Sequence, residues 1–217
     1  MANLQVMPVI KDGFTIGVKN APSLIGAVIL WILTIWIPYI NVGTTIAICS
    51  IPVALSKGKV LSPTFIFGSQ YRKQMGDVFI LEGLSLMATY FAMLFLIIPA
   101  FVLSYSWSQA LYLLLDKEYT PTEALTKSNK LTYGHKWTLF GIDILILLLV
   151  TVVIAILGYI TLEIDTVFGC CVIAVLLLLI APFTLGCHGV IYRQLTSEEP
   201  VEETIIEETI IEETVVE

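Results

Sequence analysis

Charged residues are scarce in this chain of 217 residues, and their scarcity restricts the class of protein it can be. Asp, Glu, Lys and Arg make up 13% of the residues, whereas about 25% is usual in soluble domains. Hydrophobic residues make up 57%, and the mean hydropathy is +0.91. A soluble globular domain is therefore excluded, and most of the length is available for membrane-spanning segments.

Motifs for catalysis and metal binding are also missing. The sequence has no Gly-x-Ser-x-Gly element, no Walker loop and no dinucleotide fingerprint. Spacings that present metal ligands together, such as His-x-x-x-His, Glu-x-x-His and Cys-x-x-Cys, do not occur. Cysteines in apolar stretches usually act as small packing residues, and here these are Cys49, Cys170, Cys171 and Cys187. We therefore expect no enzymatic activity, no cofactor and no metal site.

Lys and Arg are absent from three long apolar blocks, 21–56, 78–115 and 137–192. Each block is long enough to cross a membrane twice, because one crossing needs about 20 residues. All eleven basic residues lie between or outside the blocks, and cytoplasmic loops hold an excess of Lys and Arg. The pattern predicts an all-α polytopic protein of the cell (inner) membrane, with six spans in three hairpins and both termini in the cytoplasm.

Two of the blocks contain residues that indicate where each hairpin turns. The second block would form a straight helix of about 57 Å, nearly twice the apolar core, so we expect a turn at Pro99. In the third block, Glu163 and Asp165 mark an outer turn. The second crossing of the first block is short, and a re-entrant segment is the alternative there. The predicted spans are 22–40, 41–56, 78–98, 99–115, 137–161 and 168–192.

A spacing of thirteen residues from a proline to a small residue recurs three times. We interpret it as a unit in which proline starts an amphipathic helix on the cytoplasmic surface, before the chain enters the bilayer. Chance and the shared composition of membrane proteins are the alternative explanation. The pairs are Pro8–Ala21, Pro63–Gly76 and Pro121–Gly134, and the last two continue to Gly83 and Gly141. Residues expected to contact lipid headgroups or partners are Lys11, Lys19, Arg72, Lys73, Lys127, Lys130 and Lys136.

Three ionisable residues lie inside predicted spans, where a charge is costly and usually functional. These are Glu82, Asp143 and His188, all expected toward the cytoplasmic leaflet, where together they would bind a proton, a metal ion or a cationic headgroup. The alternative is that each lies only about 7–10 Å inside the interface and extends toward water. A second polar set is expected to join helices, rather than line a pore. It consists of Ser104, Ser106, Ser108 and Gln109.

The net charge of −7 comes from the end of the chain, because residues 198–217 contain nine acidic and no basic residues. We expect residues 194–217 to form an acidic, low-complexity cytoplasmic tail that is mostly disordered. Addition of this tail as a strand to a basic groove of a partner is the alternative. The remaining chain is nearly balanced in charge, and nothing in it indicates nucleic-acid binding.

The stretch EALTKSNKLTYGHKWTLFGIDILILLL, residues 123–149, resembles the signature of an uncharacterised group of prokaryotic six-helix membrane proteins. That group is similar to the membrane domain joined to some bacterial glycerophosphodiester phosphodiesterases. The resemblance extends over residues 1–193, implies a polytopic helical protein and supplies no catalytic residues. We expect no phosphodiesterase domain here. The matching residues are Ala124, Leu125, Ser128, Leu131, Gly134, His135, Lys136, Trp137 and Phe140, preceded by Pro99 and SYSWSQALYLLLD.

We therefore expect a non-catalytic integral membrane protein that organises protein partners or lipids at the cytoplasmic face of the membrane. The alternative is a small transporter or lipid-handling protein that uses Glu82, Asp143 and His188. The expected partners are membrane lipids and a cytoplasmic or membrane protein bound through the acidic tail, with no nucleic acid. The sequence indicates no oligomeric state.

Overall fold

A computed structural model describes residues 4–164 and 166–197, and within them the chain is helical without any β-strand. Six helical stretches are long and apolar enough to cross a membrane, which confirms the predicted all-α polytopic architecture. The elements in chain order are α1 (Val6–Thr34), α2 (Pro38–Cys49), α3 (Ile51–Ser56), η1 (Pro63–Phe67), α4 (Ser69–Lys73), α5 (Met75–Phe95), α6 (Ile97–Ser106), α7 (Ala110–Lys117), α8 (Pro121–Leu131), α9 (Lys136–Ile164) and α10 (Thr166–Thr196).

The first hairpin begins earlier in the chain than the sequence predicts. Helix α1 continues through Pro22, so the expected surface helix and the first span form one helix of 29 residues, about 44 Å long. The turn follows at residues 35–37 rather than near residue 40. Pro38 then begins α2, because N–H groups in a first helical turn have no intrahelical partner and proline loses nothing there.

The connection from the first to the second hairpin folds back along the first one. Ile66 of η1 is buried with Ala27 of α1 and Ala47 of α2. Arg72 of α4 lies against Gly43 of α2. A Cβ atom added at Gly43 would lie 2.7 Å from the Arg72 side chain. Gly43 precedes Lys57 by 14 residues, or roughly 20 Å of helix. The basic residues of this connection are therefore spread along the hairpin, and are not gathered at one end of it.

The second hairpin turns at Leu96, three residues before the expected Pro99. Proline is the third residue of α6, so it lies in the first turn, where it is tolerated. The second span of this hairpin is itself interrupted at residues 107–109, between α6 and α7. The turn of this hairpin is thus made by an extended residue, whereas proline only helps to start the next helix.

Helix α8 begins with a capping box and packs on the protein with its apolar face. The Thr120 side chain and the Glu123 side chain satisfy each other's backbone N–H groups, and Pro121 is the first helical residue. Ala124 and Leu125 are buried in the core that includes residues of α5 and α7. The amphipathic character is as predicted, but the apolar face covers protein rather than lipid.

Helices α1 and α10 cross at glycines that allow their backbones to touch. A Cβ atom at Gly13 would lie 2.8 Å from the Cα of Cys187, and one at Gly17 would lie 2.5 Å from the carbonyl oxygen of Pro182. Gly186 of α10 faces the carbonyl of Gly13 equally closely. Such small-residue contacts are a usual way for membrane helices to associate. They also explain why α1 stays continuous past Pro22, because α10 supports the preceding turns.

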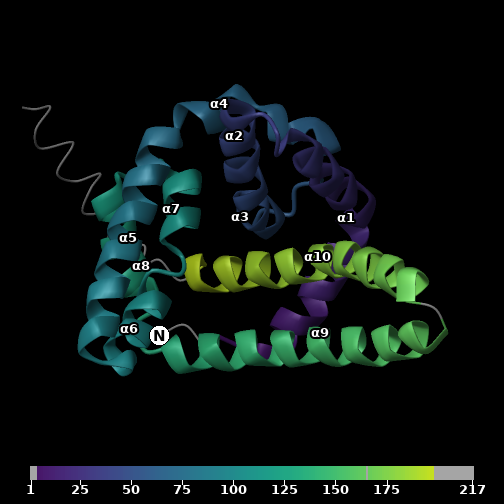
Figure 1. The fold of residues 1–217 in the computed structure, drawn as a ribbon. Coiled ribbons are helices and arrows are strands. Elements are labelled where there is room, and N and C mark those ends of the chain that lie inside the picture. Colours follow the sequence, from purple (N-terminus) through teal and green to yellow (C-terminus); the bar gives the residue numbers. More distant parts are fainter. Residues whose placement is uncertain (1–3, 165, 198–217) are drawn as a thin grey trace, which may run out of the picture.

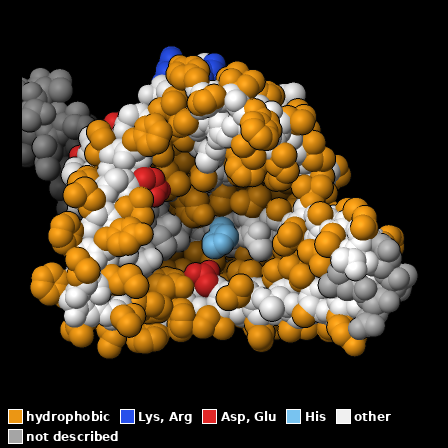
Figure 2. Space-filling model, in the orientation of Figure 1, with side chains coloured by type: hydrophobic (Ala, Val, Ile, Leu, Met, Phe, Trp, Pro, Cys, Tyr) orange, Lys and Arg blue, Asp and Glu red, His pale blue; other side chains and the backbone are white. Residues whose placement is uncertain are grey.

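The three hairpins surround an open hollow (Figures 1 and 2). In Figure 1, α5 and α6 run down the left side and α9 and α10 lie across the lower half. Helix α1 passes behind α10 and rises on the right, with α2 and α3 between these groups. Figure 2 shows the hollow on this face, walled mostly by hydrophobic side chains, with a histidine and an acidic side chain at its floor.

The prolines of the proposed repeat start helices of three different kinds. Pro8 lies in the first turn of the long helix α1, Pro63 starts a 3₁₀ helix of five residues, and Pro121 starts an α-helix of eleven. The threefold repeat therefore stays a prediction. Helix α10 continues to Thr196, past the predicted end at residue 192. The acidic residues of the tail, 198–217, lie outside the described residues.

Candidate functional site

Two of the three predicted intramembrane residues meet within the third hairpin. Asp143 of α9 and His188 of α10 are both half-buried and close enough to interact electrostatically. The hydroxyl of Tyr105 in α6 lies close enough to the Asp143 carboxyl group for the two to interact electrostatically. We call these three residues the polar site. It joins α6 to the consecutive helices α9 and α10, within segments that are otherwise strongly apolar.

A cluster of aromatic rings fixes the position of Tyr105. Its ring lies 5.9 Å from that of Phe140 and 4.9 Å from that of Phe101, measured between centroids. Phe101 also contacts Phe140 edge-on at 4.8 Å and Trp137 at 5.9 Å. Edge-to-face contacts of this kind hold rings in defined orientations. The cluster thereby joins α6 to α9 and aims the Tyr105 hydroxyl at the carboxylate.

Glu82 does not join the polar site but lines a separate cavity of about 250 Å³ between α5, α6 and α7. It is close enough to Cys49 to affect that thiol electrostatically, and Cys49 and Asp143 both act in this way on Tyr112. The three predicted residues are therefore not one cluster. Tyr112 itself lines the Glu82 cavity, so this cavity comes near the polar site.

The serine-rich segment around Trp107 has two roles. Ser104 and Ser108 line the Glu82 cavity, whereas the sequence led us to expect that they join helices. The Ser106 hydroxyl donates within its own helix, to the carbonyl of Val102. Only the backbone carbonyl of Ser106 joins helices, because it accepts a hydrogen bond from Ser128 of α8. The residue spacing alone did not separate the two roles, since all of these positions lie beside the interruption between α6 and α7.

The polar site has the chemistry of a hydrogen-bonding and proton-holding group. A carboxylate accepts hydrogen bonds, and an imidazole both donates and accepts them. The described residues contain no group of three or more His, Cys, Asp or Glu side chains that would hold a metal ion. The Asp143 carboxyl and the His188 imidazole both offer hydrogen-bond acceptors, which favours a cationic or hydroxyl-bearing ligand.

The basic residues expected to contact headgroups or partners lie on several elements. Among them, Lys136 donates to the Asn129 side chain at 3.2 Å, and Lys127 lies 5.8 Å above the Tyr119 ring. Arg72 donates to the carbonyl of Phe67 at 3.2 Å. The exposed ones are Lys11 and Lys19 on α1, Lys73 on α4 and Lys130 on α8, whereas Arg72 on α4, Lys127 on α8 and Lys136 at the start of α9 are half-buried.

A further polar contact, not anticipated from the sequence, joins all three hairpins. Asp116 of α7 pairs with Lys57 at the end of α3 and accepts a hydrogen bond from the Tyr192 hydroxyl of α10 at 2.9 Å. The Asp116 side chain is only 5% exposed. Its place at the end of an apolar span resembles an ordinary interfacial charge, so the sequence did not distinguish it.

Comparison of the chain with protein-family models, curated proteins and solved structures found no match. The resemblance of residues 123–149 to the six-helix membrane family therefore stays a prediction. Several of the resembling residues have a clear structural role: Ala124, Leu125 and Ser128 form the buried face of α8. Phe140 and Trp137 belong to the aromatic cluster that orients Tyr105.

Proposed function

We propose that this protein is a non-catalytic integral membrane protein that binds lipids between its hairpins. The headgroup would contact Asp143, His188 and Tyr105. The observation that supports this proposal best is the meeting of Asp143 with His188, from two different helices, inside apolar segments. Desolvated charges in spans are costly and are usually kept for a function.

The surroundings of the polar site suit an amphipathic ligand. The walls of the hollow in Figure 2 are mostly hydrophobic, whereas its floor is polar. A lipid has the same division between apolar chains and a polar head. A lipid ammonium or hydroxyl group would donate hydrogen bonds to the Asp143 carboxylate, so we propose an amine- or hydroxyl-bearing headgroup.

The proposal is tested by identifying the lipids that remain on the detergent-purified protein. We expect amine- or hydroxyl-bearing lipids to be enriched over the host membrane in the wild-type protein. Asp143→Asn and His188→Gln should each reduce the amount bound per protein. Asp77→Asn is the matched control, because Asp77 is an exposed carboxylate in the first turn of α5. Equal lipid content in all four proteins would remove the proposal.

A small transporter is the second candidate, and the Glu82 cavity is the observation in its favour. Glu82 and Asp143 lie in neighbouring hairpins, and Tyr112 lines the Glu82 cavity while lying close enough to Asp143 to be affected electrostatically. Proton movement into proteoliposomes, reported by a trapped pH-sensitive dye, tests this function. If the protein transports protons, the proton flux should exceed the flux into protein-free liposomes, and this excess should be lost in Glu82→Gln. Flux equal to that of protein-free liposomes would leave lipid binding as the proposal.

We also propose that both ends face the cytoplasm in the cell membrane. The number of candidate spans is even, which supports a topology with both ends of the chain on the same side of the membrane. The start of α1 and the end of α10 lie together, because the Gln5 backbone N–H donates to Gln194 at 3.1 Å and Arg193 pairs with Asp12 at 2.9 Å. Tags at either end should be protected from protease in intact cells and cleaved in inverted vesicles. Cleavage of one tag in intact cells would contradict this orientation.

Binding of a cytoplasmic or membrane protein through the acidic residues 198–217 is a separate proposal, supported by nine acidic residues without a basic one. Deletion of these residues should remove specific partners from the co-purified proteins. An unchanged set of partners would contradict it.

A further inference from the structure

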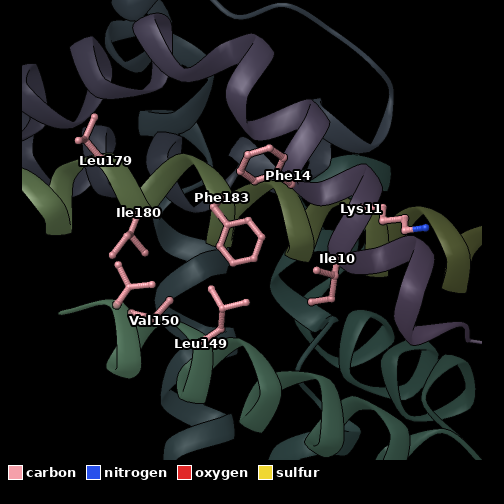
Figure 3. A pocket seen from close by; sticks show the side chains of 9 residues that line it. Ile10, Lys11, Phe14, Leu149, Val150, Leu179, Ile180 and Phe183 are labelled. Carbon is pink, nitrogen blue, oxygen red and sulfur yellow. The ribbon is translucent and has the colours of Figure 1, made fainter. Parts of the chain in front are cut away.

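A second cavity, wholly apolar apart from one lysine, lies between α1, α9 and α10 (Figure 3). Its volume is about 450 Å³, within the range of sites that bind small molecules. No residue of the polar site lines it. The lining residues are Ile10, Lys11 and Phe14 of α1, Leu149, Val150 and Val153 of α9, and Leu179, Ile180 and Phe183 of α10.

The cavity extends from the end of α1 that carries Lys11 toward the middle of α9. Lys11 precedes Gly13, which packs on Cys187 in the last third of α10. At the other end, Leu149 lies 13 residues after the start of α9 at Lys136, or roughly 20 Å along the helix. The cavity therefore has a cation at its rim and only apolar side chains further in.

Lys11 is placed to pair with an anion at this rim. Figure 3 shows its ammonium directed away from the apolar lining. The neighbouring carboxylate of Asp12 is already paired with Arg193 at 2.9 Å. Within the described residues, the local charge available at the mouth of the cavity is therefore positive.

We propose that this cavity holds one acyl chain of an anionic phospholipid, with the lipid phosphate paired to Lys11. Charge complementarity at the rim and the apolar lining support an anionic lipid over a zwitterionic one. The inference rests on the proposed lipid-binding function and deepens it, by naming a lipid class and a second site. This site recognises a phosphate, whereas the polar site recognises an amine or hydroxyl group.

The charge component is tested by native mass spectrometry of the full chain in detergent. Phosphatidylmethanol, an anionic lipid whose headgroup has no amine or hydroxyl, and phosphatidylcholine with identical chains are titrated separately. We expect the anionic lipid to bind the wild-type protein more tightly than phosphatidylcholine does. The ratio of the two affinities should fall about fivefold in Lys11→Gln, since one Lys near a lipid phosphate contributes about 1 kcal/mol. Lys19→Gln is the control, because Lys19 is an equally exposed lysine of α1 that does not line the cavity.

The apolar component is tested by filling the cavity. Leu149→Trp should weaken binding of both lipids, whereas Leu148→Trp, at an exposed neighbouring position outside the lining, should not. If Leu149→Trp does not fold, Val153→Phe replaces it. Equal effects of the two lysine variants, or full binding by the filled variants, would overturn the inference. The polar site is tested separately, by the effect of Asp143→Asn on the amine- and hydroxyl-bearing lipids that co-purify, so failure at the polar site is distinguishable from failure here.

Discussion

The hydroxyl of Ser128 in α8 donates a hydrogen bond to the backbone carbonyl of Ser106 in α6 at 2.7 Å. The same hydroxyl accepts from the backbone N–H of Gln109 at 3.2 Å. One side chain thus satisfies groups on both sides of the interruption between α6 and α7. Thr132 donates to the same carbonyl at 3.2 Å. A membrane span is broken only where other groups satisfy its free backbone atoms, so α8 is needed for the second hairpin.

Removal of this bridge should destabilise the fold. Ser128→Ala leaves buried backbone groups with fewer partners, which costs about 1–3 kcal/mol. Denaturation by sodium dodecyl sulfate in mixed micelles measures the change. Thr126→Ala on the same helix is the control, because the Thr126 side chain is exposed and bonds only within α8 in the described structure. Equal stability of the two variants would contradict the bridging role.

A larger side chain at the crossing of α1 and α10 should separate these helices. Gly17→Leu places atoms against the backbone at Pro182, and overpacking of this kind costs about 1–3 kcal/mol or more. Gly141→Leu is the control, since nothing lies within 4 Å of its Cβ position. Thermal unfolding followed by circular dichroism gives both values. A loss of stability in Gly141→Leu but not in Gly17→Leu would contradict the close crossing of α1 and α10.

The contact at Asp116 predicts a measurable interaction energy between hairpins. Tyr192→Phe removes one hydrogen bond to a charged group and should cost about 1–2 kcal/mol. Asp116→Ala should cost more, but the pair with Lys57 adds little to this, because the Lys57 side chain is 47% exposed. A double-mutant cycle in mixed micelles should give a nonzero coupling between Tyr192 and Asp116. Additive costs would contradict their contact.

Acidification should loosen the beginning of α8. The hydroxyl and backbone N–H of Thr120 donate to the Glu123 carboxylate at 2.7 and 3.0 Å, and these bonds lower the pKa of Glu123 below its ordinary value of 4.5. A lowered pKa means that this carboxylate stabilises the helix above pH 4.5 and ceases to do so as pH falls through its pKa in the folded protein. Carboxyl chemical shifts measured by NMR in micelles should show a midpoint below 4.5. A midpoint at or above that value would refute the cap.

The residues that the sequence placed best were those governed by local rules. Apolar length predicted six spans, and the proline before Glu123 predicted the start of a helix at Pro121. Turn positions were displaced by a few residues, because prolines lie inside the first turn of the following helix rather than in the turn itself. Pro99 is the clearest example.

Contacts between distant segments could not be read from the same rules. The backbone approach of Gly13 to Gly186 depends on how α1 and α10 cross, and nothing local specifies that pairing. The predicted trio of polar residues separated for the same reason. Asp143 and His188 meet because α9 and α10 are neighbours in one hairpin, whereas Glu82 belongs to another.

The most direct test of lipid binding at the polar site is photocrosslinking in membranes. The probe is phosphatidylethanolamine with a photoreactive group at the end of one acyl chain, so that its amine stays free. It is incorporated into membranes together with the full-length protein, and the adducts are mapped by mass spectrometry. We predict adducts on the segments of α6, α9 and α10 that wall the hollow, reduced by excess unlabelled phosphatidylethanolamine and by Asp143→Asn. Adducts spread evenly over the exposed apolar faces, and unaffected by either change, would contradict a headgroup site at Asp143 and His188.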